Sequence, residues 1–482
     1  MSAEANLDVF LKPESVAVIG ASERPGSWGS FMMEGLRAMD YGGEVYPVNQ
    51  RARSVYGIKA FPDVRDIPHP VDLAVVAIPE GSIEECVRAC GEKGVKGMTM
   101  ITSGFGEAVS GGREREEALT KLAHSYGLRI VGPNVSGTFN LHAGFNAAAS
   151  PAEYLYCTPL AGVCQGGYAI YDLLASGFSR KMGVGKFIHT GNESDLQVTD
   201  FLEYFGQDPQ VQGIIMYLET IRDGRRFYEV AKHVANKKPI IVHKAGRTDG
   251  GARAAQSHTG AIAGLGGIYE GAFHQANIVL SPTMELILPL AHALIECPPM
   301  RGNRVAIITM GGSWGVTLSD SLEIEGLRVP ELSTNLQKEL RDFGMPQRAS
   351  TKNPVDIGAA GIGTLSAEIL SQMGRVILSS GEIDALILHG LGRPGMVQED
   401  TSSSMKLFTH FEKEIMKEVS SLQKEMKCPV FIGSLFSNHE SQAVRDLNED
   451  GIRIYNRLDE IAQILSLLYG YWKNRDRFAC SL

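Results

Sequence analysis

The cysteines of this 482-residue sequence lack the paired spacing that holds a metal ion. Of the seven cysteines, Cys86 and Cys90 form the one close pair. They are four residues apart on an expected helix, and packing of that helix explains the pair better than a metal site does. An odd number of cysteines without a signal peptide is typical of a reducing compartment. We therefore expect a cytoplasmic protein that binds no metal through its own residues.

Long hydrophobic runs and excess positive charge are also missing. The most apolar stretch, from Leu286 to Ile295, is short and is interrupted by Pro289, whereas a membrane helix needs about 20 apolar residues. The formal net charge is −9, and phosphate backbones bind to clustered basic faces. The sequence therefore predicts neither a membrane partner nor a nucleic-acid partner.

Glycine, in contrast, is abundant, with 54 residues, or about 11% against a usual ~7%. The glycines gather after strand-like runs, which is typical of phosphate-binding loops. A chain of this length holds roughly three domains. We place them at 1–150, 151–297 and 298–482.

The first third alternates short apolar runs with helical stretches. The expected strands are 15–19, 44–48, 72–78, 97–101 and 128–131. Strands that alternate with helices at this spacing predict a parallel sheet with right-handed crossovers. The N-terminal domain is therefore expected to be Rossmann-like.

The first glycine loop, Gly20 to Gly29, indicates what this domain binds. It lacks the Gly-x-Gly-x-x-Gly spacing, and the second strand ends in Val48-Asn49 where a dinucleotide-binding fold wants an acidic residue. Both features argue against an NAD-type oxidoreductase, which is kept as an alternative. A loop that opens a helix still offers backbone N–H groups to phosphate, so coenzyme A is compatible.

The middle third repeats the scheme, with expected strands at 161–164, 186–189, 212–217 and 239–244. Gly166 and Gly167 open a helix after the first of these, and Glu219 follows the third. Consecutive strands tend to be sheet neighbours, so Glu219 should lie near whatever follows the fourth strand. A carboxylate beside an imidazole fixes its tautomer and raises its basicity. A solvated loop position for Glu219 is an equally open alternative.

His258 lies in a run of small residues, 246–261, which we interpret as a glycine-rich loop before a helix that begins near Ile262. Small neighbours let a backbone approach a ligand closely. Imidazole is a nucleophile that can carry a group between two sites. The alternative is a histidine that caps the following helix.

A linker at 298–302 leads into a third α/β unit with expected strands at 304–309, 384–389 and 429–432 and a closing helix at 458–471. Gly311 and Gly312 open a helix after the first of these strands. The segment 353–361 has little periodicity and is expected to be a loop beside a cleft. One hypothesis is that the helices opened by Gly167 and Gly312 point at a shared anion.

Four segments together resemble a known family: Ser257–Ala261, Gly132–Asn134, Asn353–Asp356 and the opening Lys12–Ser22. They are similar to the α subunits of ADP-forming acyl-CoA synthetases, in the succinyl-CoA synthetase superfamily. The resemblance covers nearly the whole chain. It implies an α/β protein with an N-terminal Rossmann-like CoA-binding domain followed by two flavodoxin-like, doubly wound ligase domains.

The resemblance also implies roles for particular residues. His258 matches the phosphorylated histidine, and Glu219 matches the glutamate that stabilises it. Phosphate contacts fall on Gly166 and Gly167, and the hypothesis of a shared anion adds Gly311 and Gly312 as candidate phosphate or substrate contacts. The positions that match the CoA site are Gly20, Ala21, Ser22, Glu23, Arg24, Pro25, Asn49, Ile78, Pro79, Thr102, Ser103 and Asn134.

The sequence departs from the family at two turns. The phosphate-facing helix usually begins Ser-x-Ser-Gly but here reads Cys164-Gln-Gly-Gly167, which removes two hydroxyls. The family's Gly-Pro-Asn-Cys is Gly-Pro-Asn-Val135. These changes keep a second function open, that of a CoA-binding regulatory protein that has lost ligase activity.

Members of the family also need an ATP-grasp domain, which we do not expect within these three α/β domains, since the sequence shows no P-loop and no Mg²⁺-binding carboxylate cluster. The resemblance therefore implies half of an enzyme, in a hetero-oligomer with an ATP-grasp β subunit that supplies ATP/ADP and Mg²⁺. The implied reaction converts a small carboxylic acid, CoA and ATP into acyl-CoA, ADP and phosphate, through an acyl phosphate and a phosphohistidine at His258.

Overall fold

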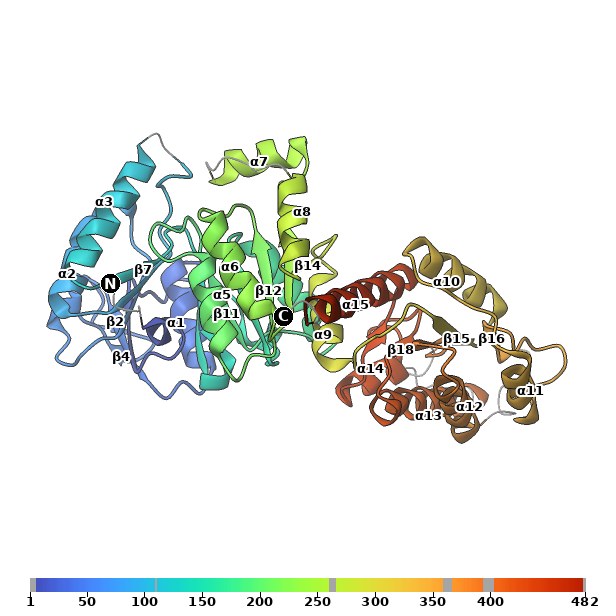
Figure 1. Ribbon diagram of the computed structural model, residues 1–482. Coiled ribbons are helices and arrows are strands. Elements are labelled where there is room, and N and C mark those ends of the chain that lie inside the picture. The colour runs from blue at the N-terminus through green and yellow to red at the C-terminus, as the bar shows by residue number, and fades with distance from the viewer. Residues whose placement is uncertain (1–5, 109–110, 260–265, 359–365, 393–402, 480–482) are drawn as a thin grey trace. The chain divides into compact units, whose positions relative to one another are not determined.

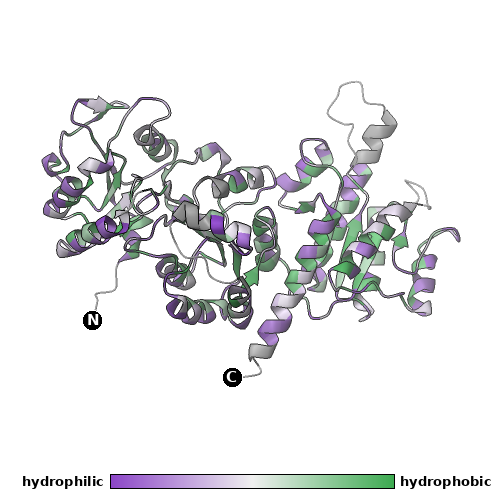
Figure 2. Ribbon diagram, turned by 90° about the horizontal axis from the view of Figure 1, so that it is seen from above, coloured by the Kyte–Doolittle hydropathy of each residue, from purple (hydrophilic) through white to green (hydrophobic). Residues whose placement is uncertain are grey.

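The computed structural model describes residues 6–108, 111–259, 266–358, 366–392 and 403–479, which form two compact units (Figure 1). The first unit contains Met1–Phe178 and Gly183–Ala291, and the second contains Ser179–Met182 and His292–Leu482. Each unit consists of parallel or mostly parallel sheets covered by helices, so the predicted α/β class is confirmed. In Figure 2 the strands are mostly green, whereas the helices alternate between purple and green.

The first sheet has the order β2-β1-β5-β6-β7, and all its strands are parallel. Its strands are β1 (Ser15–Ile19), β2 (Glu44–Val48), β5 (Leu73–Val76), β6 (Gly97–Met100) and β7 (Arg129–Val131). The central strands β1 and β5 are buried along their whole length, as expected of a parallel sheet with helices on both faces. The surrounding elements are η1 (Leu7–Phe10), α1 (Trp28–Ala38), β3 (Ser54–Val55), β4 (Ile58–Lys59), η2 (Val64–Asp66), η3 (Glu80–Ser82), α2 (Ile83–Lys93) and α3 (Gly112–Ser125).

The second sheet has seven strands in the order β14-β13-β12-β10-β11-β8-β9. Its parallel part is β10 (Leu160–Cys164), β11 (Lys186–His189), β12 (Gly213–Leu218), β13 (Ile240–Lys244) and β14 (Val279–Leu280), and the antiparallel edge is β8 (Gly137–Asn140) and β9 (Phe145–Ala148). Its other elements are η4 (Leu141–Ala143), η5 (Ala152–Tyr154), α4 (Tyr168–Phe178), α5 (Val198–Gln207), α6 (Gly224–Ala235) and α8 (Gly266–Gln275).

The two sheets of the first unit share a hydrophobic core. Phe10, which precedes the first sheet, meets Phe201 of α5 edge to face at 6.2 Å between ring centroids. Strands β8 and β9 precede residue 150 in the chain but pair within the second sheet. The predicted boundary at 150 stays a prediction, because the core is continuous across it.

The histidine segment is helical, which corrects the predicted loop. α7 spans Asp249–Thr259 and contains His258, whose side chain lies outside the described part of the structure. Thr248 caps it, since its Oγ1 accepts a hydrogen bond from the Gly251 N–H at 3.1 Å. A capping threonine followed by alanines favours helix more than the two glycines disfavour it. The predicted helix start near Ile262 falls outside the described residues.

The second unit contains a five-stranded parallel sheet in the order β16-β15-β17-β18-β19. Its strands are β15 (Val305–Thr309), β16 (Val355–Asp356), β17 (Ala385–His389), β18 (Val430–Gly433) and β19 (Ile454–Tyr455). The segment predicted as a loop at 353–361 therefore contains a short strand, and its last residues, 359–361, lie outside the described part. The helices of this unit are α10 (Gly312–Ile324), α11 (Thr334–Asp342), α12 (Ala367–Ser379), α13 (Ser403–Met426), α14 (Gln442–Glu449) and α15 (Leu458–Ala479), together with the part of α9 (Ile287–Glu296) from His292 onward.

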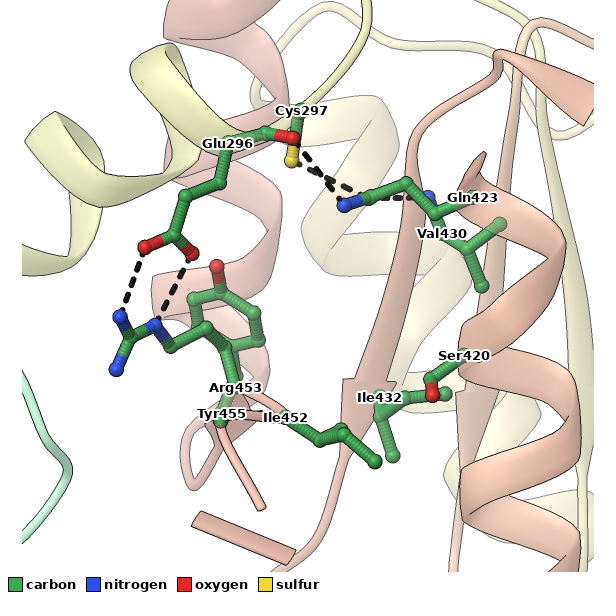
Figure 3. A pocket seen from close by; sticks show the side chains of 10 residues that line it. Glu296, Cys297, Ser420, Gln423, Val430, Ile432, Ile452, Arg453 and Tyr455 are labelled. Carbon is green, nitrogen blue, oxygen red and sulfur yellow. Dashed lines mark hydrogen bonds and ion pairs between the residues drawn. The ribbon is translucent and has the colours of Figure 1, made fainter. Parts of the chain in front are cut away.

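An ion pair near a cavity of about 150 Å³ fixes the end of α9 in the second unit (Figure 3). Arg453 approaches both carboxylate oxygens of Glu296, at 2.7 and 3.0 Å. Burial opposes ionisation of Glu296, but hydrogen bonds from His292 and Arg453 outweigh it and hold the pKa of Glu296 at about 2. Arg453 also donates to the carbonyls of Arg180 and Lys181, which explains why Ser179–Met182 belongs to this unit.

Among the residues that the structure describes, no helix has both the length and the apolar character needed to cross a membrane.

Candidate functional site

The residues that match the CoA site follow the carboxyl ends of the strands of the first sheet. Gly20 follows β1, Asn49 follows β2, Ile78 and Pro79 follow β5, Thr102 and Ser103 follow β6, and Asn134 follows β7. Because the sheet is parallel, these ends share one edge. Ligands of open α/β sheets bind outside this edge.

Two glycines determine the path of the first loop. Gly20 has a φ of +92°, and a Cβ there would lie 2.3 Å from the carbonyl oxygen of Ala77. A Cβ on Gly29 would lie 2.0 Å from the carbonyl oxygen of Gly20. The start of α1 therefore packs directly on the loop backbone, which only glycine allows at both positions. Glu23, Arg24 and Pro25 are exposed beyond this contact.

Two of the other predicted CoA contacts brace the same edge. The Asn49 side chain donates to the Ala21 carbonyl at 2.8 Å and accepts from the backbone N–H groups of Arg51 and Ala52. The Thr102 hydroxyl donates to the Ile78 carbonyl at 2.7 Å. Both side chains therefore hold neighbouring strand ends together, and their direct contact with CoA stays a prediction.

A cavity of about 460 Å³ joins this edge to the second sheet. It is lined by five residues that were predicted from the sequence to belong to the site: Ser103, Asn134, Gly166, Gly167 and Glu219. The other lining residues were not predicted from the sequence and are Trp28, Ile101, Val135, Ser136, Gln165, His189 and Tyr217. His189 and Gln165 could have been suspected, since one ends a buried strand and the other begins the glycine turn.

Glu219 is held in place by the glycine turn. It is 5% exposed, which excludes the alternative of a solvated loop side chain. The side-chain oxygen of Gln165 accepts hydrogen bonds from the backbone N–H groups of Glu219, at 2.7 Å, and Thr220, at 3.0 Å. Gln165 thus ties the end of β12 to the turn after β10, which fixes the carboxylate relative to Gly166 and Gly167.

The two departures from Ser-x-Ser-Gly have physical reasons. A Cβ on Gly166 would lie 2.6 Å from Tyr217 Cε1 and 3.2 Å from the Glu219 carboxylate. The Tyr217 ring therefore occupies the space that a serine would need. The Cys164 thiol donates to the Gly166 carbonyl at 2.7 Å, and burial raises its pKa, so it stays protonated. The turn can offer backbone N–H groups to phosphate but no hydroxyl of its own.

The side chain of His189 forms a hydrogen bond with the backbone of this turn. Its Nδ1 accepts from the Ser136 backbone N–H at 2.8 Å, and its Nε2 lies 2.9 Å from the Gln165 carbonyl. An acceptor at Nδ1 and a donor at Nε2 describe the neutral tautomer protonated at Nε2. Because both nitrogens are used inside the protein, we interpret His189 as a structural residue that joins the Ser136 and Gln165 turns.

The remaining predicted residues lie on two different units. His258 belongs to α7 of the first unit, and β12 and β13, which lead to Glu219 and to α7, are parallel neighbours as predicted. Gly311 is the N-cap of α10 in the second unit, and a Cβ on Gly312 would lie 3.1 Å from the Asp356 carboxylate. The shared anion between Gly167 and Gly312 stays a hypothesis.

Comparisons with protein families define the class of protein. Residues 14–139 match a CoA binding domain, residues 158–294 a succinyl-CoA ligase like flavodoxin domain, and residues 305–426 a ligase-CoA domain. The first match agrees with the loop chemistry and favours CoA over NAD. The chain is therefore built as a CoA-binding protein of the succinyl-CoA ligase type.

Full-length relatives define the family. The chain is 37% identical over 471 residues to the α subunit of ADP-forming acetate–CoA ligase II of Pyrococcus furiosus, covering 97% of this chain and 98% of the relative. It belongs to this family of ADP-forming acetate–CoA ligase α subunits, as the motifs predict. The solved acetyl-coenzyme A synthetase 1 of Ca. Korarchaeum cryptofilum, in complex with phosphate and ADP, has a TM-score of 0.85, 33% identity and 99% coverage of both chains.

A third relative is a longer protein, of which this chain matches only part. The ADP-forming acetate–CoA ligase of Methanocaldococcus jannaschii is 36% identical over 348 residues, which cover 72% of this chain but 48% of that protein. About half of this relative thus has no counterpart in the matched region.

Proposed function

We propose that the chain performs the CoA and phosphohistidine steps of an ADP-forming acid–CoA ligase, with His258 as the phosphorylated residue and Glu219 as its stabilising carboxylate. The observation that carries the proposal is the shared cavity, in which the CoA edge of the first sheet meets the Gly166–Gly167 turn and buried Glu219. Thiol, phosphate and acid must meet for this reaction, and positioning supplies most of the rate in phosphoryl transfer.

The proposed reaction has three steps. A phosphoryl group from ATP is transferred to a ring nitrogen of His258, which releases ADP. A carboxylate oxygen of the acid attacks this phosphorus, forming an acyl phosphate and freeing the imidazole. The deprotonated CoA thiol attacks the acyl carbon and expels phosphate. Glu219 would hold the ring N–H of the phosphorylated imidazole, while the N–H groups of Gly166 and Gly167 would bind phosphoryl oxygens.

The nucleotide step needs a partner in this proposal. The unmatched half of the Methanocaldococcus relative supports a second component, which we propose is an ATP-grasp β subunit in a hetero-oligomer. That subunit would hold ATP and Mg²⁺, and the metal would neutralise charge on the transferred phosphoryl group. The chain described here would receive the phosphoryl group on His258 and deliver it to the acid.

The reverse half-reaction tests this function on the chain alone. Incubation with acetyl-CoA and labelled phosphate should give free CoA, acetate and an acid-labile, base-stable label on the protein, because neither step uses ATP. Butyryl-CoA and an aryl acyl-CoA extend the test to bulkier acids. A regulatory protein without ligase chemistry would bind CoA but stay unlabelled with all three compounds, which would overturn the proposal.

The CoA loop gives a separate prediction. Ser22→Trp should weaken CoA binding at least about tenfold, or ~1.4 kcal/mol, because a bulky side chain blocks the approach of the diphosphate to the loop backbone. Titration calorimetry with CoA measures the effect, and circular dichroism checks the fold. Ser22 is half-buried, whereas a substitution at Gly20 would collide with the Ala77 carbonyl and disturb the fold itself.

The matched control is Ser22→Ala, which removes the hydroxyl that accepts from the Arg24 N–H at 3.0 Å without adding bulk. It should bind CoA within a few-fold of wild type. Preferential binding of NADH over CoA by the wild-type chain would contradict the assignment of this loop.

A further inference from the structure

A buried cation lies beside Glu219 and has no role in the steps above. Lys244, the last residue of β13, is 2% exposed. Its ammonium donates to the carbonyl of Glu219 at 2.7 Å and to the carbonyl of Ala245 at 2.5 Å, and it lies 4.5 Å from the centre of the Tyr269 ring. Burying an ammonium group costs free energy unless hydrogen bonds compensate for its lost hydration. The two carbonyls provide that compensation for Lys244.

The three contacts join three segments of the first unit. Glu219 follows β12, Ala245 begins the connection to α7, and Tyr269 belongs to α8, which follows α7 in the chain. In Figure 1, α7 and α8 follow one another at one end of this unit. Lys244 therefore joins the backbone of Glu219 to α8, the helix after the one that contains His258.

The backbone of Glu219 is held from two sides. Its N–H donates to the side chain of Gln165, from the turn after β10, and its carbonyl accepts from Lys244, at the end of β13. Without Lys244, the carbonyl of Glu219 loses this hydrogen bond, while its N–H keeps the hydrogen bond to Gln165.

We propose that Lys244 is a positioning residue, which fixes the backbone of Glu219 against the end of β13 and so holds the carboxylate where the proposed reaction of His258 needs it. The proposal rests on the proposed function. Lys244 does not line the described cavity, so its effect is on the rate of phosphoryl transfer and not on the binding of substrates.

The charge of Lys244 depends on its surroundings. Burial lowers the pKa of Lys244 to about 8, the Glu219 carboxylate favours the charged form, and the Arg247 guanidinium disfavours it. The Tyr269 ring also packs against the ammonium. At neutral pH the ammonium is charged, and its hydrogen bonds are the stronger, charge-assisted kind. They should weaken as pH rises through about 8.

Lys238, a half-buried residue two positions before β13 begins, offers a control near the opposite end of this strand. Its ammonium also donates to two backbone carbonyls, those of Phe205 at 2.7 Å and Asp208 at 2.6 Å. Lys238→Met therefore removes two hydrogen bonds of the same kind, far along β13 from the cavity.

The experiment measures labelling of His258 from acetyl-CoA and labelled phosphate. Lys244→Met should slow it on the order of 10- to 100-fold, the scale for misplacing a reacting group by about 1 Å, with unchanged KM for acetyl-CoA and phosphate. Lys238→Met should lower the melting temperature by a comparable amount but label at the wild-type rate. Lys244→Arg should recover most of the rate and, because arginine stays charged, remove the decline above about pH 8.

Wild-type labelling rates for Lys244→Met, or an equal loss for Lys238→Met, would overturn the positioning role. If Lys244→Met does not fold, the pH profile of Lys244→Arg decides, and a profile identical to wild type up to pH 9 would refute it. A wild-type chain that is never labelled defeats the proposed function instead, so the two failures are distinguishable.

Discussion

His258→Ala should abolish labelling of the chain and all acyl-CoA formation in the presence of its partner. A phosphoryl group needs a nucleophilic ring nitrogen to carry it, and alanine provides none. His258 lies in α7, where alanine is the most favourable helix residue, so the fold should be kept. Acid-labile, base-stable label on the purified variant, measured after acetyl-CoA and phosphate, checks this directly.

His274, an exposed histidine of α8, is the matched control. His274→Ala should be labelled at the wild-type rate, which shows that removing a histidine near this segment is harmless in itself. If His258 merely capped a helix, its replacement would cost about 1 kcal/mol of stability and leave the chemistry unchanged. Near wild-type acyl-CoA formation by His258→Ala would leave the proposed mechanism without its phosphoryl carrier.

The purified chain alone should form no acyl-CoA from acid, CoA and ATP, whereas the chain with an ATP-grasp subunit should. In the proposed division of labour His258 reacts with acyl phosphate by itself but receives phosphate from ATP only through the partner. Coupled measurement of ADP and acyl-CoA, with and without a co-expressed ATP-grasp subunit, gives the comparison.

The half-reaction with acetyl-CoA and phosphate is the internal control, because it should proceed without the partner and so proves that the lone chain is competent. Adding the partner to His258→Ala should restore nothing. Sustained ATP-dependent turnover by the lone wild-type chain would disprove the half-enzyme interpretation.

Apolar runs bounded by glycine were enough to predict most of the parallel strands. The run 15–19 became β1 and 44–48 became β2 without change, and 72–78 shortened to Leu73–Val76. Strands buried on both faces must be apolar throughout, so they stand out in a sequence. The parallel order then places their carboxyl ends, with Gly20 and Asn134 among them, along one edge.

Helix and strand propensities were harder to judge where neighbouring residues favour different structures. The segment 249–259 contains two glycines and was predicted as a loop, yet the cap at Thr248 and its alanines make it α7. Strand β16 has two residues and no alternation to detect, since it forms only through its pairing with β15. Both errors arise because a cap or a partner strand decides the structure and neither is a periodic pattern.

By itself the sequence determined the α/β class, the CoA-binding family, and the candidate pair His258 and Glu219, since motifs and strand ends are local in the chain. Only the tertiary structure decided that Tyr217 excludes a side chain at position 166, and that Gln165 and Lys244 hold Glu219 from two sides. These contacts join residues in or directly after different strands, and the two hydrogen bonds to Glu219 span 54 and 25 positions. Their meeting depends on sheet order and register, which no short stretch of sequence encodes.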